Sequence, residues 1–180
     1  MQPTIVTLSN SQPVIAELAD LLVETVAAGG SVNFLHPLSK QMAEAFWRNA
    51  LSAADRGERI VLGARAAGML VSTASVRLDS PPNAQHRAEV TKVMTRVAFR
   101  NRGIARALML EVERAAAARG ITLLTLDTAR DDGAAGFYER LGYELAGVIP
   151  DYASKPHGGL TDAIFYWKRI GPLADLAVAD

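Results

Sequence analysis

A basic segment between Lys92 and Arg106 holds the residues whose types and spacing are best suited to chemistry. It contains no acidic residue, although the whole chain balances 19 Lys and Arg against 19 Asp and Glu. Its cations are Lys92, Arg96, Arg100, Arg102 and Arg106. A strand is predicted to give way to a helix here, where free backbone N–H groups beside the small residues Gly103 and Ala105 would suit a phosphate. Alternatively, the cations solvate a loop and the small residues ease helix packing; the spacing alone leaves both interpretations open.

Two carboxylates are candidates for proton transfer. Glu89 and Asp127 fall on neighbouring predicted strands. Two close carboxylates raise the pKa of one of them, which is useful for a general base near neutral pH. Structural roles compete with this interpretation, since Glu89 would pair with Lys92 or Arg87 and Asp127 would cap a turn at the end of its strand.

Other kinds of catalytic site are excluded by what the sequence lacks. The chain has no cysteine, which removes disulfides, thiolate metal sites and cysteine nucleophiles. It has no phosphate-binding loop of the Walker type, no Gly-x-Gly-x-x-Gly after a strand and no Gly-x-Ser-x-Gly turn. The three histidines, His36, His86 and His157, are far apart and lack metal-ligand spacing, so we expect no metal.

Length and composition predict one domain. A chain of 180 residues with 49% apolar residues forms a single core, which we assign to residues 1–170 with a peripheral tail at 171–180. Zero net charge argues against a nucleic-acid partner. The longest apolar stretch, Ile60–Ser75, is too short to cross a membrane, and no secretory signal is evident, so we expect a cytoplasmic protein without a membrane partner.

The elements that must position these residues alternate between strand and helix patterns. Strands are predicted at Thr4–Ser9, Ile60–Arg65, Met69–Leu78, Arg87–Val97, Ile121–Asp127, Tyr143–Ile149 and Asp162–Arg169. Helices are predicted from Pro13 to Gly29, from Ser39 onward, from Gly103 to Gly120, and from Asp131 or Asp132 to Gly142, and a loop that is neither helix nor strand at Ser80–Gln85. This order predicts an α/β (α+β) fold with a mixed sheet, mostly antiparallel with one parallel pair, and helices on both faces.

Two linked motifs resemble the signatures of the GNAT acetyltransferase superfamily. Arg100-x-x-Gly103-x-Ala105, after the strand Glu89–Val97, resembles its acetyl-CoA loop. The run Asp131-x-x-Ala134-x-x-Phe137-Tyr138-x-x-Leu141-Gly142-Tyr143 resembles its second signature, with Asp131 in place of the customary Asn. The resemblance implies a seven-stranded GNAT-like sheet whose parallel pair splays apart. More narrowly, Ala88-Glu89-Val90 and Leu126-Asp127-Thr128 are similar to the tabtoxin-resistance branch, which acetylates an amine of a β-lactam toxin.

The resemblance implies acetyl-CoA as co-substrate, held mainly by backbone groups. Amides of Arg102–Arg106 would hold the pyrophosphate, and main-chain groups of Met94–Arg96 would pair with the pantetheine. A main-chain N–H near Met94 would polarise the thioester carbonyl. The expected cofactor-binding residues are Met94, Thr95, Arg96, Arg100, Asn101, Arg102, Gly103, Ile104, Ala105, Arg106 and Asp131. The contact that Asp131 would make with the pantetheine is left open by the change from Asn.

The same resemblance assigns catalytic roles. Glu89 or Asp127 would take a proton from the acceptor amine, and Tyr138 would give one to the departing thiolate; alternatively, Tyr138 only packs beside Phe137. The acceptor is expected to be a primary amine of a small molecule, such as a toxin or antibiotic. A protein or peptide acceptor, a non-catalytic acyl-CoA sensor and a homodimer are left open. Without cysteine, we expect direct transfer from the thioester.

Overall fold

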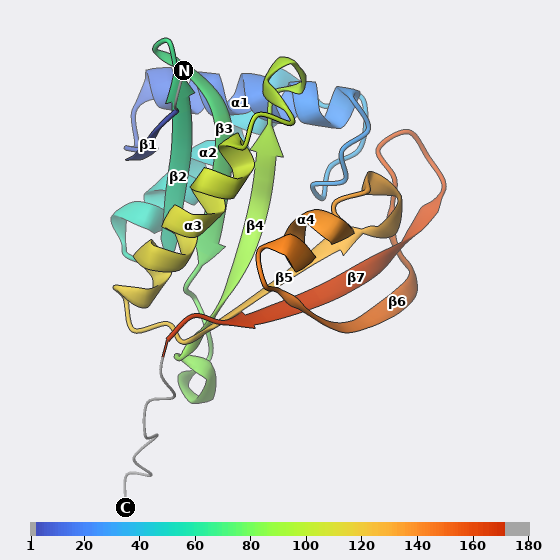
Figure 1. The fold of residues 1–180 in the computed structure, drawn as a ribbon. Coiled ribbons are helices and arrows are strands. Elements are labelled where there is room, and N and C mark those ends of the chain that lie inside the picture. The colour runs from blue at the N-terminus through green and yellow to red at the C-terminus, as the bar shows by residue number, and fades with distance from the viewer. Residues whose placement is uncertain (1–2, 172–180) are drawn as a thin grey trace, which may run out of the picture.

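The computed structural model describes residues 3–171 (Figure 1). Its strands are β1 (Thr4–Thr7), β2 (Arg59–Ala66), β3 (Met69–Arg77), β4 (Arg87–Thr95), β5 (Leu123–Ala129), β6 (Glu144–Ser154) and β7 (Leu160–Arg169). Its helices are α1 (Gln12–Ala27), α2 (Lys40–Asp55), α3 (Ile104–Ala117) and α4 (Ala135–Arg140). Single 3₁₀ turns lie at Pro82–Ala84, Val97–Phe99 and Arg130–Asp132.

One mixed sheet of seven strands, in the order β1-β2-β3-β4-β5-β7-β6, forms the centre of the molecule. Every neighbouring pair is antiparallel except β4 and β5, which are parallel. This parallel pair has only three rungs: Arg87–Leu123, Ala88–Leu124 and Glu89–Thr125. Beyond Glu89 the two strands diverge, as Figure 1 shows. The predicted fold class, with its splayed parallel pair, is therefore confirmed.

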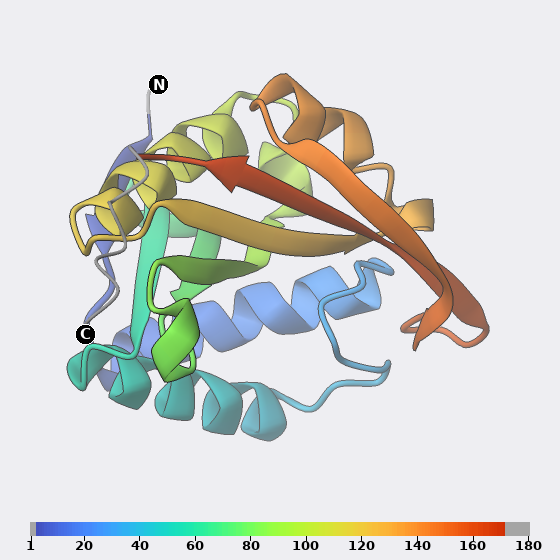
Figure 2. The ribbon, with the colours of Figure 1, turned by 90° about the horizontal axis from the view of Figure 1, so that it is seen from below.

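Helices cover both faces of the sheet, as predicted, and each pair builds its own core (Figure 2). On one face, α3 and α4 bury residues such as Leu108, Val112 and Tyr138 against the sheet. On the other face, α1 and α2 bury residues such as Leu18 and Trp47. Burial of apolar side chains contributes about 25 cal/mol to the free energy of folding per Å² of surface removed from water. The close packing of the two cores makes the sheet a rigid support for the site.

A bulge at Lys92 reverses the alternation of β4. Lys92 has a positive φ of 55°, and the β3–β4 register shifts here. Before the bulge, Ala88 and Val90 belong to the core under α3, whereas Met94 beyond it belongs to the core under α1 and α2. Because side chains alternate with period two in a regular strand, one extra residue exchanges the faces for everything that follows.

Several element boundaries differ from the prediction. The last helix begins at Ala135 rather than at Asp131 or Asp132, because Arg130–Asp132 forms a 3₁₀ turn. Strand β4 ends at Thr95 rather than Val97, because Val97–Phe99 closes a 3₁₀ turn. Strand β6 continues to Ser154, well past the predicted Ile149. The predicted loop Ser80–Gln85 contains a 3₁₀ turn, since the φ that proline fixes is compatible with the first residue of such a turn.

Two further expectations concern the ends of the chain and its surroundings. The predicted peripheral tail lies outside the described residues from residue 172 onward. Between residues 3 and 171, every helix is too short or too polar to span a bilayer.

Candidate active site

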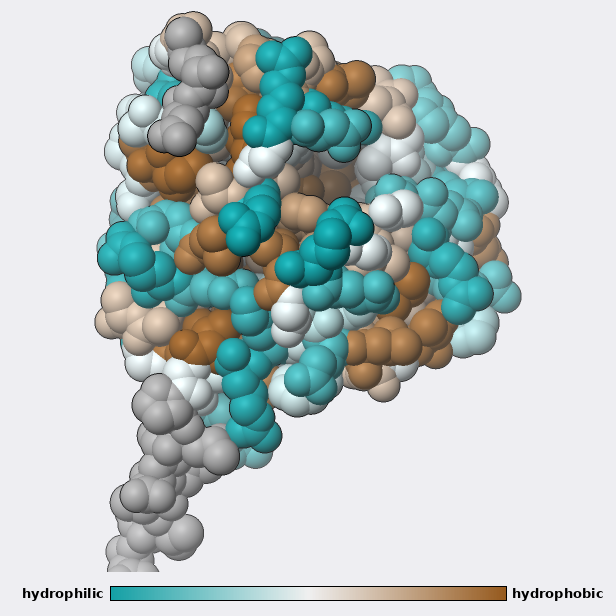
Figure 3. Space-filling view, in the orientation of Figure 1, coloured by the Kyte–Doolittle hydropathy of each residue, from teal (hydrophilic) through white to brown (hydrophobic). Residues whose placement is uncertain are grey.

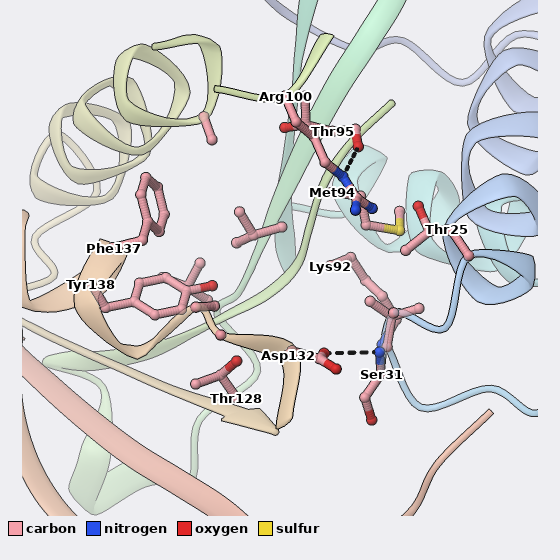
Figure 4. A pocket seen from close by; sticks show the side chains of 18 of the residues that line it. Thr25, Ser31, Lys92, Met94, Thr95, Arg100, Thr128, Asp132, Phe137 and Tyr138 are labelled. Atoms are coloured by element: carbon pink, nitrogen blue, oxygen red, sulfur yellow. Dashed lines mark hydrogen bonds between the residues drawn. The ribbon is translucent and has the colours of Figure 1, made fainter. Parts of the chain in front are cut away.

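A cavity of about 790 Å³ opens where β4 and β5 diverge. Its walls come from the second half of β4, the end of β5, the start of α3, the start of α4 and the segment after α1. Figure 3 shows a hollow on this side of the molecule, rimmed largely by hydrophilic residues, and Figure 4 shows the lining from close by. The volume falls within the range of small-molecule sites.

The N-terminus of α3 fits an anionic group. Gly103 precedes the helix in a left-handed conformation (φ 75°), and no side chain caps the first turn. A side chain added at Gly103 would meet no protein atom within 4 Å, so this space belongs to the cavity. The first backbone N–H groups of the helix are thus free for a ligand, and the exposed cations Arg100 and Arg106 line the same wall. This arrangement fits the pyrophosphate of acetyl-CoA.

The main chain of β4 offers a second set of groups, and here the expected residues need correction. The Arg96 N–H donates to the Val71 carbonyl (2.9 Å), so Arg96 faces β3. Because alternate residues of an antiparallel pair face the neighbouring strand, Met94 also faces β3, whereas Val93 and Thr95 face the gap. The N–H that we expected near Met94 is therefore best supplied by Val93, a residue that the sequence analysis did not select.

Most of the expected cofactor-binding residues line the cavity, but two do not. Those on the cavity wall are Met94, Thr95, Arg100, Asn101, Gly103, Ile104, Ala105, Arg106 and Asp131. Arg96 instead forms an ion pair with Glu24 of α1 and donates through Nε to the Leu70 carbonyl (2.9 Å). The Arg102 guanidinium lies over the Phe99 ring at 5.3 Å. The side chain and the N–H of Arg96 are thus engaged within the protein, whereas Arg102 is exposed.

The two aspartates after β5 tie the cavity wall to distant segments. Asp131, where the family signature has Asn, pairs with Lys155 (3.2 Å). Asp132 accepts a hydrogen bond from the Ser31 N–H (3.0 Å), which connects the wall to the segment after α1 (Figure 4). Partial burial raises the pKa of Asp132. Asp131 thus carries a charge close to the expected cofactor, in contrast with the neutral amide of the signature.

Tyr138 lies deep in the cavity wall, with only 6% of its surface exposed. Its ring packs against Phe137 (5.1 Å between centroids) and Tyr143 (5.9 Å). Figure 4 shows its hydroxyl directed into the cavity. Burial, with smaller contributions from the charges of Asp127 and Asp132, raises the pKa of Tyr138, so the hydroxyl stays protonated and can donate. Packing and a position suited to donation coexist at this residue.

The structure brings Asp127 to the cavity but not Glu89. Asp127 lies at the diverging end of β5, lines the cavity and is exposed, and partial burial of its carboxyl raises its pKa while the charge of Lys92 opposes the shift. Glu89 lies in the last rung of the parallel pair, below the opening, and pairs with Arg77 (3.4 Å) rather than with Lys92 or Arg87. The expected coupling of two carboxylates is not seen, because burial, and not Glu89, raises the pKa of Asp127.

Lys92 is a cavity residue that the sequence analysis placed with the phosphate-directed cations. Its ammonium lies instead against the rings of Phe34 (5.7 Å) and Phe46 (5.4 Å), under α1 and α2. Burial lowers its pKa to about 8, the charge of Arg59 adds to this effect, and Asp127 opposes it. No sequence signal marks the bulge that turns this side chain away from the α3 end of the cavity.

A sheet that splays beside an uncapped helix N-terminus, with Asp127 and Tyr138 in the same opening, is the arrangement expected of an acyl-CoA-dependent transferase. Residues 27–143 match the family described as Acetyltransferase (GNAT) family. The chain belongs to this family.

Individual relatives agree with this assignment. An uncharacterized N-acetyltransferase encoded in the hisH-hisA intergenic region of Azospirillum brasilense is 31% identical over 113 residues, which are 62% of this chain and 66% of that protein, just under two thirds of its length. The structure of yncA from Salmonella typhimurium with its cofactor acetyl-CoA superimposes with a TM-score of 0.80 at 17% identity, covering 99% of this chain and all of that one. A ribosomal-protein-alanine N-acetyltransferase from Brucella melitensis gives 0.77 at 20% identity, covering 92% and 99%. At these identities, the two structures support the fold alone.

Proposed function

We propose that this protein transfers the acetyl group of acetyl-CoA directly to a primary amine of a small molecule. The observation that carries the proposal is the meeting of three features in one cavity: the uncapped α3 N-terminus, the Asp127 carboxylate and the Tyr138 hydroxyl. Acetyl-CoA supplies the activated acetyl group as a thioester when it is bound. The residues around it must position it, take a proton from the amine and return one to sulfur.

Asp127 has the role of general base. An alkyl ammonium with a pKa near 10.4 is only about 0.04% neutral at pH 7, so a base that removes its proton speeds the reaction. The raised pKa of Asp127 brings this carboxyl closer to the working pH than that of an ordinary aspartate. Glu89 is the weaker candidate, because it lies below the opening and is paired with Arg77.

Tyr138 and the main chain of β4 complete the transfer. The Val93 N–H faces the gap, where it can polarise the thioester carbonyl. The C–N bond forms as the C–S bond breaks, and Tyr138 donates its proton to the sulfur. Of the two protons that the nitrogen loses, one goes to Asp127 and then to solvent, and the other restores Tyr138.

A small acceptor is favoured over a polypeptide by contacts that tie the acceptor side together. The segment between α1 and α2 is held against the β6–β7 hairpin, since the His36 N–H donates to the Pro156 carbonyl (2.9 Å) and the His36 and His157 rings are in contact, tilted by 43° with their centroids 4.5 Å apart. A groove for a polypeptide would need this side open. The tabtoxin-like residues around Glu89 and Asp127 further suggest a toxin or antibiotic as the natural acceptor.

Release of free CoA, measured with a panel of acceptors, tests the proposal. The panel contains simple amines, polyamines, aminoglycosides, amino-acid toxins, amino acids and peptides. We expect turnover with at least one small amine. Turnover with peptides only would favour the protein or peptide N-acetyltransferase alternative, and tight acetyl-CoA binding without turnover of any acceptor would favour a sensor.

A further inference from the structure

Lys92 differs from the other lysines of the chain in having no carboxylate partner. The chain has four lysines, all within the described residues. Lys40 pairs with Asp20 (2.7 Å), Lys155 with Asp131 (3.2 Å) and Lys168 with Glu113 (2.8 Å). Within residues 3–171, Lys92 has neither an ion pair nor a hydrogen-bond acceptor for its ammonium, although it is the lysine on the cavity wall.

The surroundings of Lys92 make an unpaired charge costly. Its side chain is partly buried, and its ammonium lies over the rings of Phe34 and Phe46, which hold it by cation–π attraction. The positive charges of Arg59 and Arg77 act on it, while Asp127 and Glu89 oppose them. A methionine would fill the same space without desolvating a charge. An anionic group that enters the cavity and pairs with the Lys92 ammonium would offset this cost.

The placement of Lys92 relative to Asp127 indicates what that group is. The two residues reach the same cavity from the two strands that diverge, Lys92 from the bulge of β4 and Asp127 from the end of β5. A substrate whose ammonium faces Asp127 and whose carboxylate faces Lys92 would complement the charges of these two walls.

We propose that Lys92 forms the binding site for an acidic group of the acceptor, so that the substrate is an amino acid or a compound built like one. This inference rests on the proposed function and narrows it. With the substrate amine at Asp127, its carboxylate lies at Lys92 and fills the unused donors of the ammonium. Polycations without an acidic group, such as polyamines and aminoglycosides, are poor acceptors, because they bring a positive charge to Lys92.

Matched acceptors that differ only in the acidic group provide the test. CoA release is measured with L-amino acids, with their amides and with the corresponding decarboxylated amines, for example L-leucine, L-leucinamide and isoamylamine. Amidation lowers the pKa of the amine and makes it the better nucleophile unless the carboxylate is recognised. We expect at least a tenfold higher kcat/KM for the acid in the best series. Equal or higher kcat/KM for the amides and amines in every series that is turned over would overturn the inference while leaving the acetyltransferase proposal intact.

Variants of Lys92 separate charge recognition from packing. Lys92→Gln should raise KM for the acid at least tenfold, leave kcat within a few-fold and leave KM for the amide unchanged, whereas Lys92→Arg should retain most of the preference. Lys40→Met, which removes an exposed, paired lysine on α2, is the matched control and should change neither value. A purely structural role for Lys92 would alter the acid and the amide alike.

A binding measurement keeps the test decisive even without turnover. The four lysines are reductively methylated with ¹³C-formaldehyde, and their NMR signals are followed as L-leucine or isoamylamine is added to the protein saturated with CoA. The Lys92 signal should shift with L-leucine and not with isoamylamine, with the three paired lysines as internal references. No shift of the Lys92 signal with any of the amino acids would overturn the inference, whatever the CoA-release assay shows.

Discussion

The cavity has two halves that recognise their ligands by different means. In the α3 half, the groups available are the backbone N–H groups of Val93 and Thr95 on β4 and of Ile104–Arg106 at the start of α3, and Gly103 leaves the space beside the helix open. In the half beneath α1 and α2, the groups are side chains from separate elements, chiefly Lys92 and Asp127. A backbone site suits an invariant co-substrate, and a site built from side chains can change its acceptor without altering the fold.

The largest expected effect comes from adding a side chain at Gly103, in the α3 half of the cavity. Gly103→Glu should weaken acetyl-CoA binding by about 1,000-fold, because both the bulk and the negative charge enter the anion site. Isothermal titration calorimetry with acetyl-CoA measures the loss. Gly68→Glu is the matched control, since Gly68 also has a positive φ (81°) and open space around it but lies in the β2–β3 turn. Normal binding by the Gly103 variant would refute the assignment of this half.

The next effect should fall on turnover rather than on binding. Tyr138→Phe should lower kcat by about 100-fold with little change in KM for acetyl-CoA, as expected for a lost proton donor. Tyr143→Phe is the matched control, because that hydroxyl is buried in the same aromatic cluster without a hydrogen-bond partner among the described residues. Similar kcat values for the two variants would remove Tyr138 from the chemistry.

A smaller effect is expected from the base. Asp127→Asn should lower kcat/KM by about tenfold, while Glu89→Gln should leave it nearly unchanged. Because burial raises the pKa of Asp127, this carboxylate is protonated at a higher pH than an ordinary aspartate. Activity of the wild type should therefore fall on acidification through that raised pKa, and the Asn variant should lose this limb of the pH profile. The reverse ranking of the two variants would make Glu89 the base.

The smallest effect should come from Asp131 on the cavity wall. Asp131→Asn restores the amide of the family signature and removes a negative charge near the expected cofactor, which should tighten acetyl-CoA binding about twofold at low salt. The exposed pair with Lys155 is worth well under 1 kcal/mol, so stability should barely change. Weaker binding by this variant would show that the aspartate itself contacts the co-substrate.

The sequence predicted the fold correctly, and the predicted change from strand to helix around Gly103 lies on the cavity wall. Both depend on patterns between neighbours in the chain, such as strand alternation and the Arg100–Ala105 loop. It misplaced Glu89, because nothing in the sequence shows that the parallel register ends at this residue. It also did not show that the Val93 N–H faces the gap or where the Lys92 side chain points, since a one-residue bulge decides which face each residue beyond it occupies.

Contacts between distant segments were equally out of reach. The Ser31–Asp132 hydrogen bond and the contact between the His36 and His157 rings join residues more than 100 positions apart. No local pattern of charge or hydrophobicity predicts such pairs, and they shape the acceptor half. The identity of the acceptor was therefore the part of the function that the sequence left most open.

The three rungs between β4 and β5 also have a consequence for the lifetime of the protein. Within the described residues, they are the only strand pairing between the part of the sheet formed by β1 to β4 and the part formed by β5, β7 and β6. A co-substrate that pairs with Val93 and Thr95 would extend the pairing between β4 and β5. At a free concentration of 100 times its Kd, it would add about 2.7 kcal/mol to the free energy of unfolding. We expect the protein to resist proteolysis when acetyl-CoA is plentiful and to be degraded faster when it is scarce, so that enzyme abundance would follow the metabolic state of the cell.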